Sequence, residues 1–519
     1  MKRRTALQAS LGVVAALALA ACGSGNGGSG AGGAAADTLT IGLSSAPNSL
    51  DPAQIATGPF LSYLDPAYAT LLTRNTNGSL GAGLADKWGY TGTGNTEFRL
   101  RLRSGVKFAD GTPITAADVI KSFQHFQKGS GPNASNYRPL TFTAPDRTTV
   151  LVKSPAPNPD MGALFTPQFL GGAIISPAGL KAPKKLASAT FGAGPYTYSA
   201  AQSVSGDHYV YVPNKNFYDQ SSIHYKKITV RVIPNVNSQV QALKSGQIDF
   251  MYGTPDVAPT IAGDSSLTVV KKPTTWAGLF LLDRDGTVVK GLADVRVRQA
   301  LNYAIDRDAI TKAVYGAYGT PVSQPAMPGY DGFSTDAQKM YPYDPAKARK
   351  LLARAGYAKG LSIPVNYGSF DPTTAKLVQA VQGQLEKVGV TLKLKAATNF
   401  GGWIDDLLTK KFAATVLSPG QGGDANFYAQ QAGFTKTGIM NVFGVQDPDV
   451  DAAYSRLAAS NAKASGAAAK NLTDVITRDA LALPVSGADL IIMHNKKLHG
   501  VQFPQGSSLP TSVTAWTSR

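Results

Sequence analysis

Cysteine is almost absent from this sequence, and histidine and charged residues are sparse. The 519 residues include one cysteine, Cys22, and five histidines, and 16% of the residues are charged. A single cysteine excludes a disulfide framework and a thiolate metal cluster. The histidines stand apart from one another, which weighs against a metalloenzyme. Hydrophobic residues make up 43% of the chain, so its composition and length indicate a globular protein of two or three domains.

Long hydrophobic runs are also missing, except near the N-terminus. Basic residues at 2–4 precede an apolar run over 11–21 that ends at Cys22. A basic segment followed by roughly 7–15 apolar residues is typical of a secretory signal, and a membrane-spanning helix needs about 20. We therefore expect residues 1–21 to be a signal peptide, with a true anchor helix as the alternative. The residues do not distinguish general secretory export from twin-arginine export.

The end of the apolar run, Leu19-Ala20-Ala21-Cys22, resembles the lipobox of bacterial lipoproteins. This resemblance implies that the Cys22 sulfur carries a diacylglyceryl group and that Cys22 begins the mature chain. Residues 22–36 are rich in glycine, serine and alanine, a composition typical of a flexible tether. We expect a lipid-anchored protein on the extracytoplasmic face of the cell membrane.

The net charge is strongly positive but scattered. The chain has 50 Lys and Arg against 33 Asp and Glu, a net charge of +17, and removing the three basic residues of the signal leaves about +14. No run of five basic residues occurs, and an exported chain does not meet nucleic acid. A basic surface facing anionic lipid or cell wall is the expected consequence, with no nucleic-acid partner.

The body of the chain has the pattern of an α/β protein. Residues 361–367 predict a strand, 373–388 an amphipathic helix and 390–394 a second strand, a unit typical of a parallel sheet. Asp344, Pro345 and Gly356 have the N-cap, N1 and C′ positions of another helix. Further elements are expected at 39–43 and 98–102 (strands) and at 116–126 (a helix).

Catalytic motifs are missing. The sequence has no Gly-x-Ser-x-Gly elbow, no Walker loop, no His-Glu-x-x-His pair and no Cys-x-x-Cys. Asp306 with Asp308, and Asp405 with Asp406, are spaced so that the two carboxylates of each pair do not face each other on a helix. We therefore predict that the protein is not an enzyme and needs no cofactor or metal.

Six strings in the body resemble the family 5 extracellular solute-binding proteins of bacterial ABC importers, the group of oligopeptide-, dipeptide- and nickel-binding proteins. The clearest is VRVRQALNYAIDRDAI at 295–310, and the second is FRLRLRSGVKFADGTPITAADV at 98–119. The six occur in the order found in the family. The other four are NSLDP at 48–52, FGAGPY at 191–196, LKSGQID at 243–249 and YDP at 343–345.

This resemblance implies a two-lobed periplasmic-binding-protein-like fold of type II with an additional inserted domain. Solute would bind between lobes that close on it, and an importer with permease and ATPase subunits would receive it. Lobe one is expected at 37–60, 188–282 and 488–519. The inserted domain is expected at 61–187 and lobe two at 283–487.

Candidate solute-contacting residues follow from position in this fold. The loop after the first strand should reach the cleft, as should residues at the first crossing between lobes and residues beyond the strand that ends near 394. Aromatic rings at these places would either stack on a solute or pack in the core. The candidates are Ser45, Ala46, Asn48, Trp276, Phe280, Asn399, Phe400 and Trp403.

One departure from the family pattern bears on the solute. Peptide-binding members often carry a Trp-x-Ala-Asp-Tyr-like string whose aspartate meets the amino terminus of the ligand. Here residues 418–424 read SPGQGGD, so Gln421 and Asp424 complete the candidate set. A peptide is the expected solute, with a sugar, an opine-like compound or a metal chelate as alternatives. An exported hydrolase and a surface sensor or scaffold without transport are the alternative functions.

Overall fold

A computed structural model describes residues 38–56, 58–131, 133–417, 433–436, 438, 440–461 and 463–518. Most strands belong to one large mixed sheet. Its strands are β1 (Thr38–Leu43), β8 (Tyr196–Tyr198), β9 (His208–Pro213), β10 (Lys227–Val232), β11 (Phe250–Gly253), β12 (Leu267–Leu281), β13 (Gly319–Pro321), β14 (Leu361–Gly368), β15 (Val390–Ala397), β16 (Ala414–Leu417) and β17 (Ala482–Asn495). Their order is β15-β14-β16-β12-β17-β11-β1-β10-β9-β8, and β13 pairs with β17.

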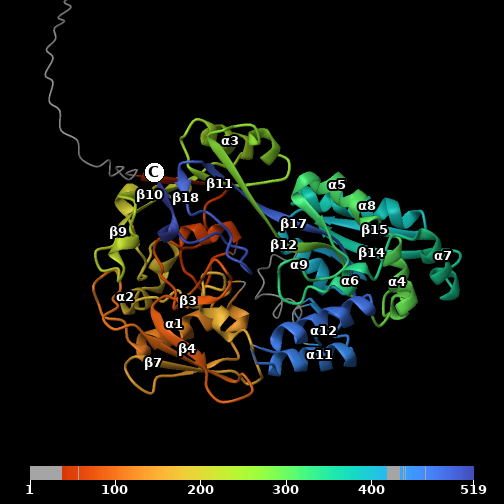
Figure 1. The fold of residues 1–519 in the computed structure, drawn as a ribbon, viewed down its shortest axis with the longest axis horizontal. Coiled ribbons are helices and arrows are strands. Elements are labelled where there is room, and N and C mark those ends of the chain that lie inside the picture. The colour runs from red at the N-terminus through yellow and green to blue at the C-terminus, as the bar shows by residue number, and fades with distance from the viewer. Residues whose placement is uncertain are drawn as a thin grey trace, which may run out of the picture. The chain divides into compact units, whose positions relative to one another are not determined.

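The two longest strands join the halves of this sheet. β12 and β17 run antiparallel, and one end of the pair adjoins β11 while the other adjoins β16 (Figure 1). Their register shifts between Pro273 and Thr275 and again at Gly278. A Cβ on Gly278 would lie 2.1 Å from the Leu483 carbonyl oxygen, so only glycine permits this close approach.

The strand–helix–strand unit predicted from periodicity is confirmed. β14 and β15 pair in parallel and are connected by α8 (Pro372–Glu386), which buries Leu377, Val381 and Leu385. Helix α7 (Pro345–Arg354) begins at an Asp344 N-cap whose carboxylate accepts from the Lys347 amide, and Gly356 follows it at φ +90°. The α/β class and these local boundaries follow from caps and apolar spacing.

A second, antiparallel sheet lies in the region 61–187. It contains β4 (Ala85–Tyr90), β5 (Glu97–Leu102), β7 (Thr149–Lys153) and β6 (Thr141–Thr143), in that order. Helix α1 (Ala116–Gln127) carries a capping box between Thr115 and Asp118 and packs beside β6 and β7. Phe123 of this helix lies 4.4 Å from Phe142 between ring centroids, inside an apolar core shared with β1 and β10.

The remaining helices and short strands complete the body. The helices are α2 (Pro177–Lys181), α3 (Val236–Lys244), α4 (Val295–Tyr303), α5 (Arg307–Tyr315), α6 (Thr335–Lys339), α9 (Phe400–Leu408), α11 (Pro448–Ala459) and α12 (Ser465–Arg478). The short strands are β2 (Leu72–Arg74) with β3 (Leu80–Ala82), and β18 (Leu498–His499) with β19 (Thr517–Ser518). Within the described ranges, no helix combines the length and apolarity needed to cross a bilayer.

Buried arginines organise the signature string at 295–310. Arg307 is 8% exposed and donates to the carbonyl oxygens of Val322, Pro484 and Tyr341 among others. Arg298 donates to the Asp479 carbonyl oxygen in the same way. Arg307 thus connects α5 to β17, and Arg298 connects α4 to the end of α12, so both side chains have a structural role.

Candidate functional site

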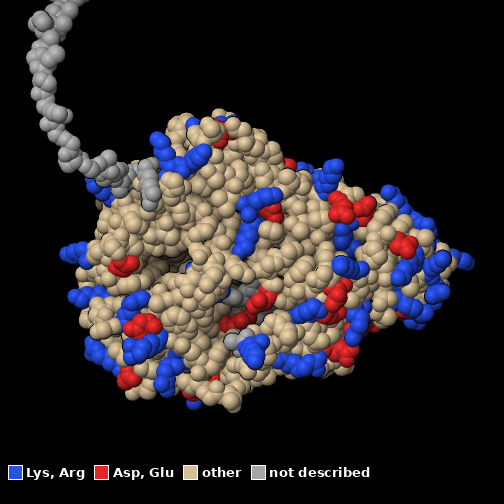
Figure 2. Space-filling view, viewed as in Figure 1, with Lys and Arg blue, Asp and Glu red and all other residues tan. Residues whose placement is uncertain are grey.

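The site is a cavity where three distant parts of the chain meet. It encloses about 360 Å³ between the β2–β3 turn, the loop before α6 and a segment near the C-terminus. Figure 2 shows a hollow with acidic side chains near the middle of this face. The lining residues are Arg74, Asn77, Gly78, Gly329, Tyr330, Asp331, Gln505 and Gly506.

Charges of both signs converge on this cavity. Arg74 ends β2, and burial lowers the pKa of its guanidinium while the negative charges of Asp160 and Asp331 oppose that shift. Burial, with the added repulsion of Asp331, raises the pKa of Asp160 to about 7, and the charge of Arg74 acts in the opposite direction. Arg74 and Asp331 therefore line the cavity within electrostatic reach of each other and of Asp160.

Charged residues of the two crossing strands lie near the cavity-lining residue Tyr330. Lys272 of β12 donates to the Pro504 carbonyl oxygen at 2.7 Å, and its Nζ lies 5.3 Å from the centre of the Tyr330 ring. On β17, Asp489 lies 3.6 Å from Lys271, and burial raises the pKa of the Asp489 carboxyl. Asp489 Oδ1 and the Tyr330 hydroxyl are buried and have no hydrogen-bond partner among the described residues. Buried polar atoms of this kind suit a bound polar solute, which would satisfy them.

The predicted loop residues Ser45, Ala46 and Asn48 follow β1 and lie apart from this cavity's lining. The Tyr63 hydroxyl donates to the Ser45 carbonyl oxygen at 2.8 Å. The Asn48 side chain accepts from the Ala56 amide and donates to the Gln54 carbonyl oxygen, both at 2.9 Å, so its polar atoms close its own loop. Their contact with solute stays a prediction.

The predicted aromatic residues gather in one buried cluster. Trp276 and Phe280 are each 3% exposed and stack with centroids 4.8 Å apart, and Phe280 stacks in turn on Phe434 at 5.4 Å. Trp403 is 4% exposed, belongs to the same cluster, and its Nε1 donates to Thr415 Oγ1 at 3.0 Å. These contacts favour packing, which was one of the two expected roles. Contact with solute is untested.

Two of the remaining candidates lie at the start of a helix, and the other two lie outside the described residues. Asn399 is the N-cap of α9, and its Oδ1 accepts from the Gly402 amide at 2.9 Å. Phe400 is the first residue of α9. Gln421 and Asp424, like Cys22, lie outside the described residues.

Sequence reasoning missed Arg74, Asp160, Tyr330, Asp331 and Asp489. Each is an isolated polar residue with no motif around it, and the residues that meet in the cavity come from positions about 70 to 500 in the chain. The one available signal was the loop Pro-Gly-Tyr-Asp-Gly at 328–332, where turn-forming residues carry an aromatic ring and an acid.

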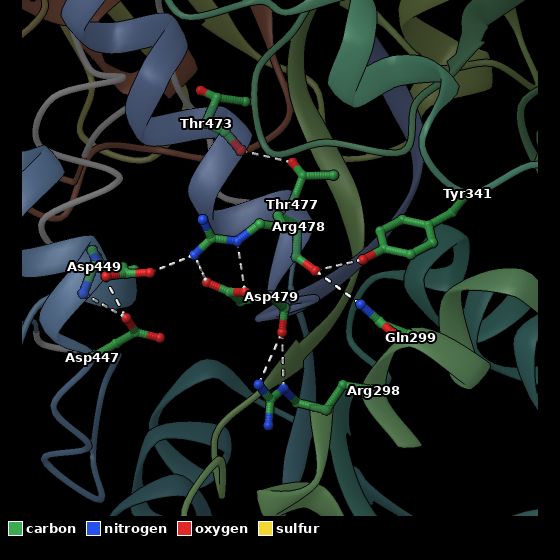
Figure 3. Close-up of polar contacts among 10 residues, drawn as sticks. Arg298, Gln299, Tyr341, Asp447, Asp449, Thr473, Thr477, Arg478 and Asp479 are labelled. Atoms are coloured by element: carbon green, nitrogen blue, oxygen red, sulfur yellow. Dashed lines mark hydrogen bonds and ion pairs between the residues drawn. The ribbon is translucent and has the colours of Figure 1, made fainter. Parts of the chain in front are cut away.

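Two other features contain acidic residues, a pocket that includes Asp65 and an ion-pair network around Arg478. A pocket of about 600 Å³ includes Asp65, but that carboxylate accepts from the Val513 amide at 2.8 Å and so holds the C-terminal segment. At the end of α12, Arg478 pairs with Asp449 and Asp479, each at 2.6 Å (Figure 3). The Arg478 carbonyl oxygen accepts from the Tyr341 hydroxyl. This network connects α12 to α11 and to Tyr341 and serves structure.

Solved structures define the class of protein to which this arrangement belongs. The ABC transporter substrate-binding protein CtaP from Listeria monocytogenes matches with a TM-score of 0.78 at 21% identity, over 93% of this chain and 99% of its own. The periplasmic murein tripeptide-binding protein MppA, in its unliganded open form, gives 0.76 at 22% identity, over 93% and 97%. The fold is the two-lobed type II periplasmic-binding-protein fold with an additional domain, and that prediction is confirmed.

The sequence then specifies the family. The model described as "Bacterial extracellular solute-binding proteins, family 5 Middle" matches residues 79–441, and the chain belongs to this family. The probable D,D-dipeptide-binding periplasmic protein DdpA of Escherichia coli K12 is 28% identical over 376 residues, 70% of this chain and 71% of its own. The glutathione-binding protein GsiB of Pectobacterium atrosepticum is 28% identical over 369 residues, 70% of each chain. The family consists of extracytoplasmic binding proteins of ABC transporters, and not of enzymes.

Proposed function

We propose that the protein is a lipid-anchored receptor that captures a short peptide between its lobes and delivers it to an ABC importer by cleft closure. The observation that carries the proposal is the mixed-charge cavity between segments from distant parts of the chain. We further propose the division into lobe one (37–60, 188–282, 488–519), an inserted domain (61–187) and lobe two (283–487). Cavity walls from all three regions would move together when the lobes close.

Peptide chemistry fits this cavity. A peptide at neutral pH has a carboxylate at one end and an ammonium group at the other. Of the lining residues, Arg74 would supply a guanidinium for the carboxylate, and Asp331 would supply an acceptor for the ammonium group. The names of the relatives, dipeptide- and glutathione-binding, support the same class.

Calorimetry with a library of di- and tripeptides tests the proposal. We expect saturable binding without turnover, and we expect Arg74→Gln to weaken it by roughly 10- to 100-fold because a charge-assisted hydrogen bond contributes about 1.5–3 kcal/mol. Arg101→Gln, an exposed arginine paired with Asp86, is the matched control and should bind normally. Binding only of a nickel chelate, an opine or a sugar would replace the peptide assignment, and product formation would refute the receptor function.

The lipid anchor has a separate test. Two buried acyl chains give stable membrane attachment, so Cys22→Ser should move the protein from the membrane fraction to the soluble fraction. The unmodified chain and the variant are compared by fractionation and mass spectrometry. Equal retention of both would remove Cys22 from the proposal and favour an uncleaved anchor helix.

A further inference from the structure

Exposed cations concentrate at the end of the body that carries α7. Figure 2 shows Lys and Arg side chains gathered over this end. Ala348 and Leu352 bury one side of α7, and its basic residues project from the other side. The start of α4, the end of α8 and the turn after α7 add further cations. We call this set the α7 basic surface: Arg296, Lys347, Arg349, Lys350, Arg354, Lys359 and Lys387.

Backbone contacts hold these side chains in one surface. Arg296 Nη1 donates to the Arg354 carbonyl oxygen at 3.2 Å, which joins α4 to the end of α7. Arg349 Nη1 donates to the Lys387 carbonyl oxygen at 3.4 Å, which joins α7 to the end of α8. Lys347 lies 3.9 Å from the centre of the Tyr303 ring. These contacts connect α4, α7 and the end of α8, so the basic residues of the three helices belong to one part of the surface.

Acids do not neutralise this surface. Its segments contain seven exposed cations and three acids. The acids are Asp294, Asp344 and Glu386. Asp294 pairs with Arg296, and Asp344 is occupied as the N-cap of α7. Within the described parts of the chain, Lys350, Arg354 and Lys359 form no ion pair. A net excess of four positive charges over the α7 basic surface attracts an extended anionic partner.

We propose that the α7 basic surface docks the protein on an anionic lipid bilayer. The cations are carried on an exposed helix, and long flexible stems let each charge follow a fluid layer of headgroups. Two partly exposed apolar side chains flank them, Val295 beside Arg296 and Tyr343 before α7, at 37% and 47% exposure. Such side chains favour the membrane–water interface. The family works outside the cytoplasmic membrane, so its outer leaflet is the adjacent surface. The proposal is independent of which solute binds.

Vesicle binding tests this surface. The full chain, in a Cys22→Ser background that removes any lipid, is titrated with vesicles of phosphatidylglycerol and phosphatidylcholine and with vesicles of phosphatidylcholine alone. The test variant is Arg349→Gln/Lys350→Gln/Arg354→Gln, since glutamine keeps helix propensity. The matched control removes three exposed cations elsewhere, Lys181→Gln/Lys184→Gln/Lys185→Gln. Thermal melting confirms that each variant is folded.

We expect binding to the anionic vesicles only, weakened by salt, and roughly 100-fold weaker for the test variant, since each cation near an anionic surface contributes about fivefold. The control variant should bind within a few-fold of the parent. Equal weakening of both variants would show a general charge effect and overturn the proposal. Binding to soluble polyglutamate but not to vesicles would also overturn it, in favour of an acidic protein partner.

Discussion

The carboxyl group of Asp160 should make stability depend on pH between about 4 and 7. Its pKa is raised from an ordinary value of 3.8 to about 7, first by burial and then by Asp331, while Arg74 acts against the shift. The folded state therefore binds this proton more tightly than the unfolded chain does. The resulting stabilisation is fully present below the unfolded pKa and is lost as pH rises through the folded pKa.

The magnitude follows from the shift. About three pH units at 1.36 kcal/mol each would give about 4 kcal/mol for a fully buried carboxyl. Asp160 keeps part of its surface accessible, so water screens the interaction and we expect about half of that, near 2 kcal/mol. Asp160→Asn is uncharged at every pH and should remove this contribution.

The test compares the parent with Asp160→Asn. The free energy of unfolding of each is measured by urea unfolding at several pH values from 4 to 8. The free energy of unfolding of the parent should fall by about 2 kcal/mol relative to the variant as pH rises across this range. Arg74→Gln removes the charge that lowers the Asp160 pKa, so it should move the same transition to higher pH. Parallel pH curves for parent and Asp160→Asn would refute the assignment of a raised pKa.

Three further substitutions separate packing from binding. Trp403→Ala should reduce the free energy of unfolding by about 3–5 kcal/mol because the ring is buried, and an unchanged melting temperature with lost solute affinity would return Trp403 to the binding site. Arg307→Met should cost roughly 3–5 kcal/mol by denaturant unfolding, while exposed Arg99→Met stays within about 0.5. Gly194→Ala places a Cβ 2.3 Å from the Ala67 carbonyl carbon and should lower the melting temperature sharply, unlike Gly263→Ala in open space.

Local elements of the fold were predictable because their signals are local. The unit β14–α8–β15 has apolar spacing that changes from two residues to about 3.6 and back, with Gly389 at φ +86° after the helix. The capping box at Thr115 likewise depends on two residues three apart. The glycines at 192 and 194, inside one of the six strings, approach the backbone of residues 66 and 67 so closely that a Cβ would not fit.

The cavity could not be predicted in the same way. Arg74 and Asp331 are 257 positions apart, and only the crossing of β12 and β17 brings their regions to one place. Position beyond a strand end predicted Trp403 as a solute contact, but whether its ring fills the core depends on Thr415 and on neighbours such as Phe434. Periodicity carries no information about such tertiary partners.

The six strings shared with the family and the cavity have different roles in this molecule. Arg298 and Arg307, inside the string at 295–310, donate to backbone carbonyl oxygens of distant segments and so secure the fold. The residues that line the cavity, Arg74, Tyr330 and Asp331 among them, lie outside all six strings. A carbonyl oxygen is present whatever the side chain, so the strings can secure the scaffold without fixing what the cleft binds. Substitutions within the strings should therefore lower stability while the folded fraction keeps its affinity, whereas Arg74→Gln should lower affinity in addition to shifting the Asp160 transition.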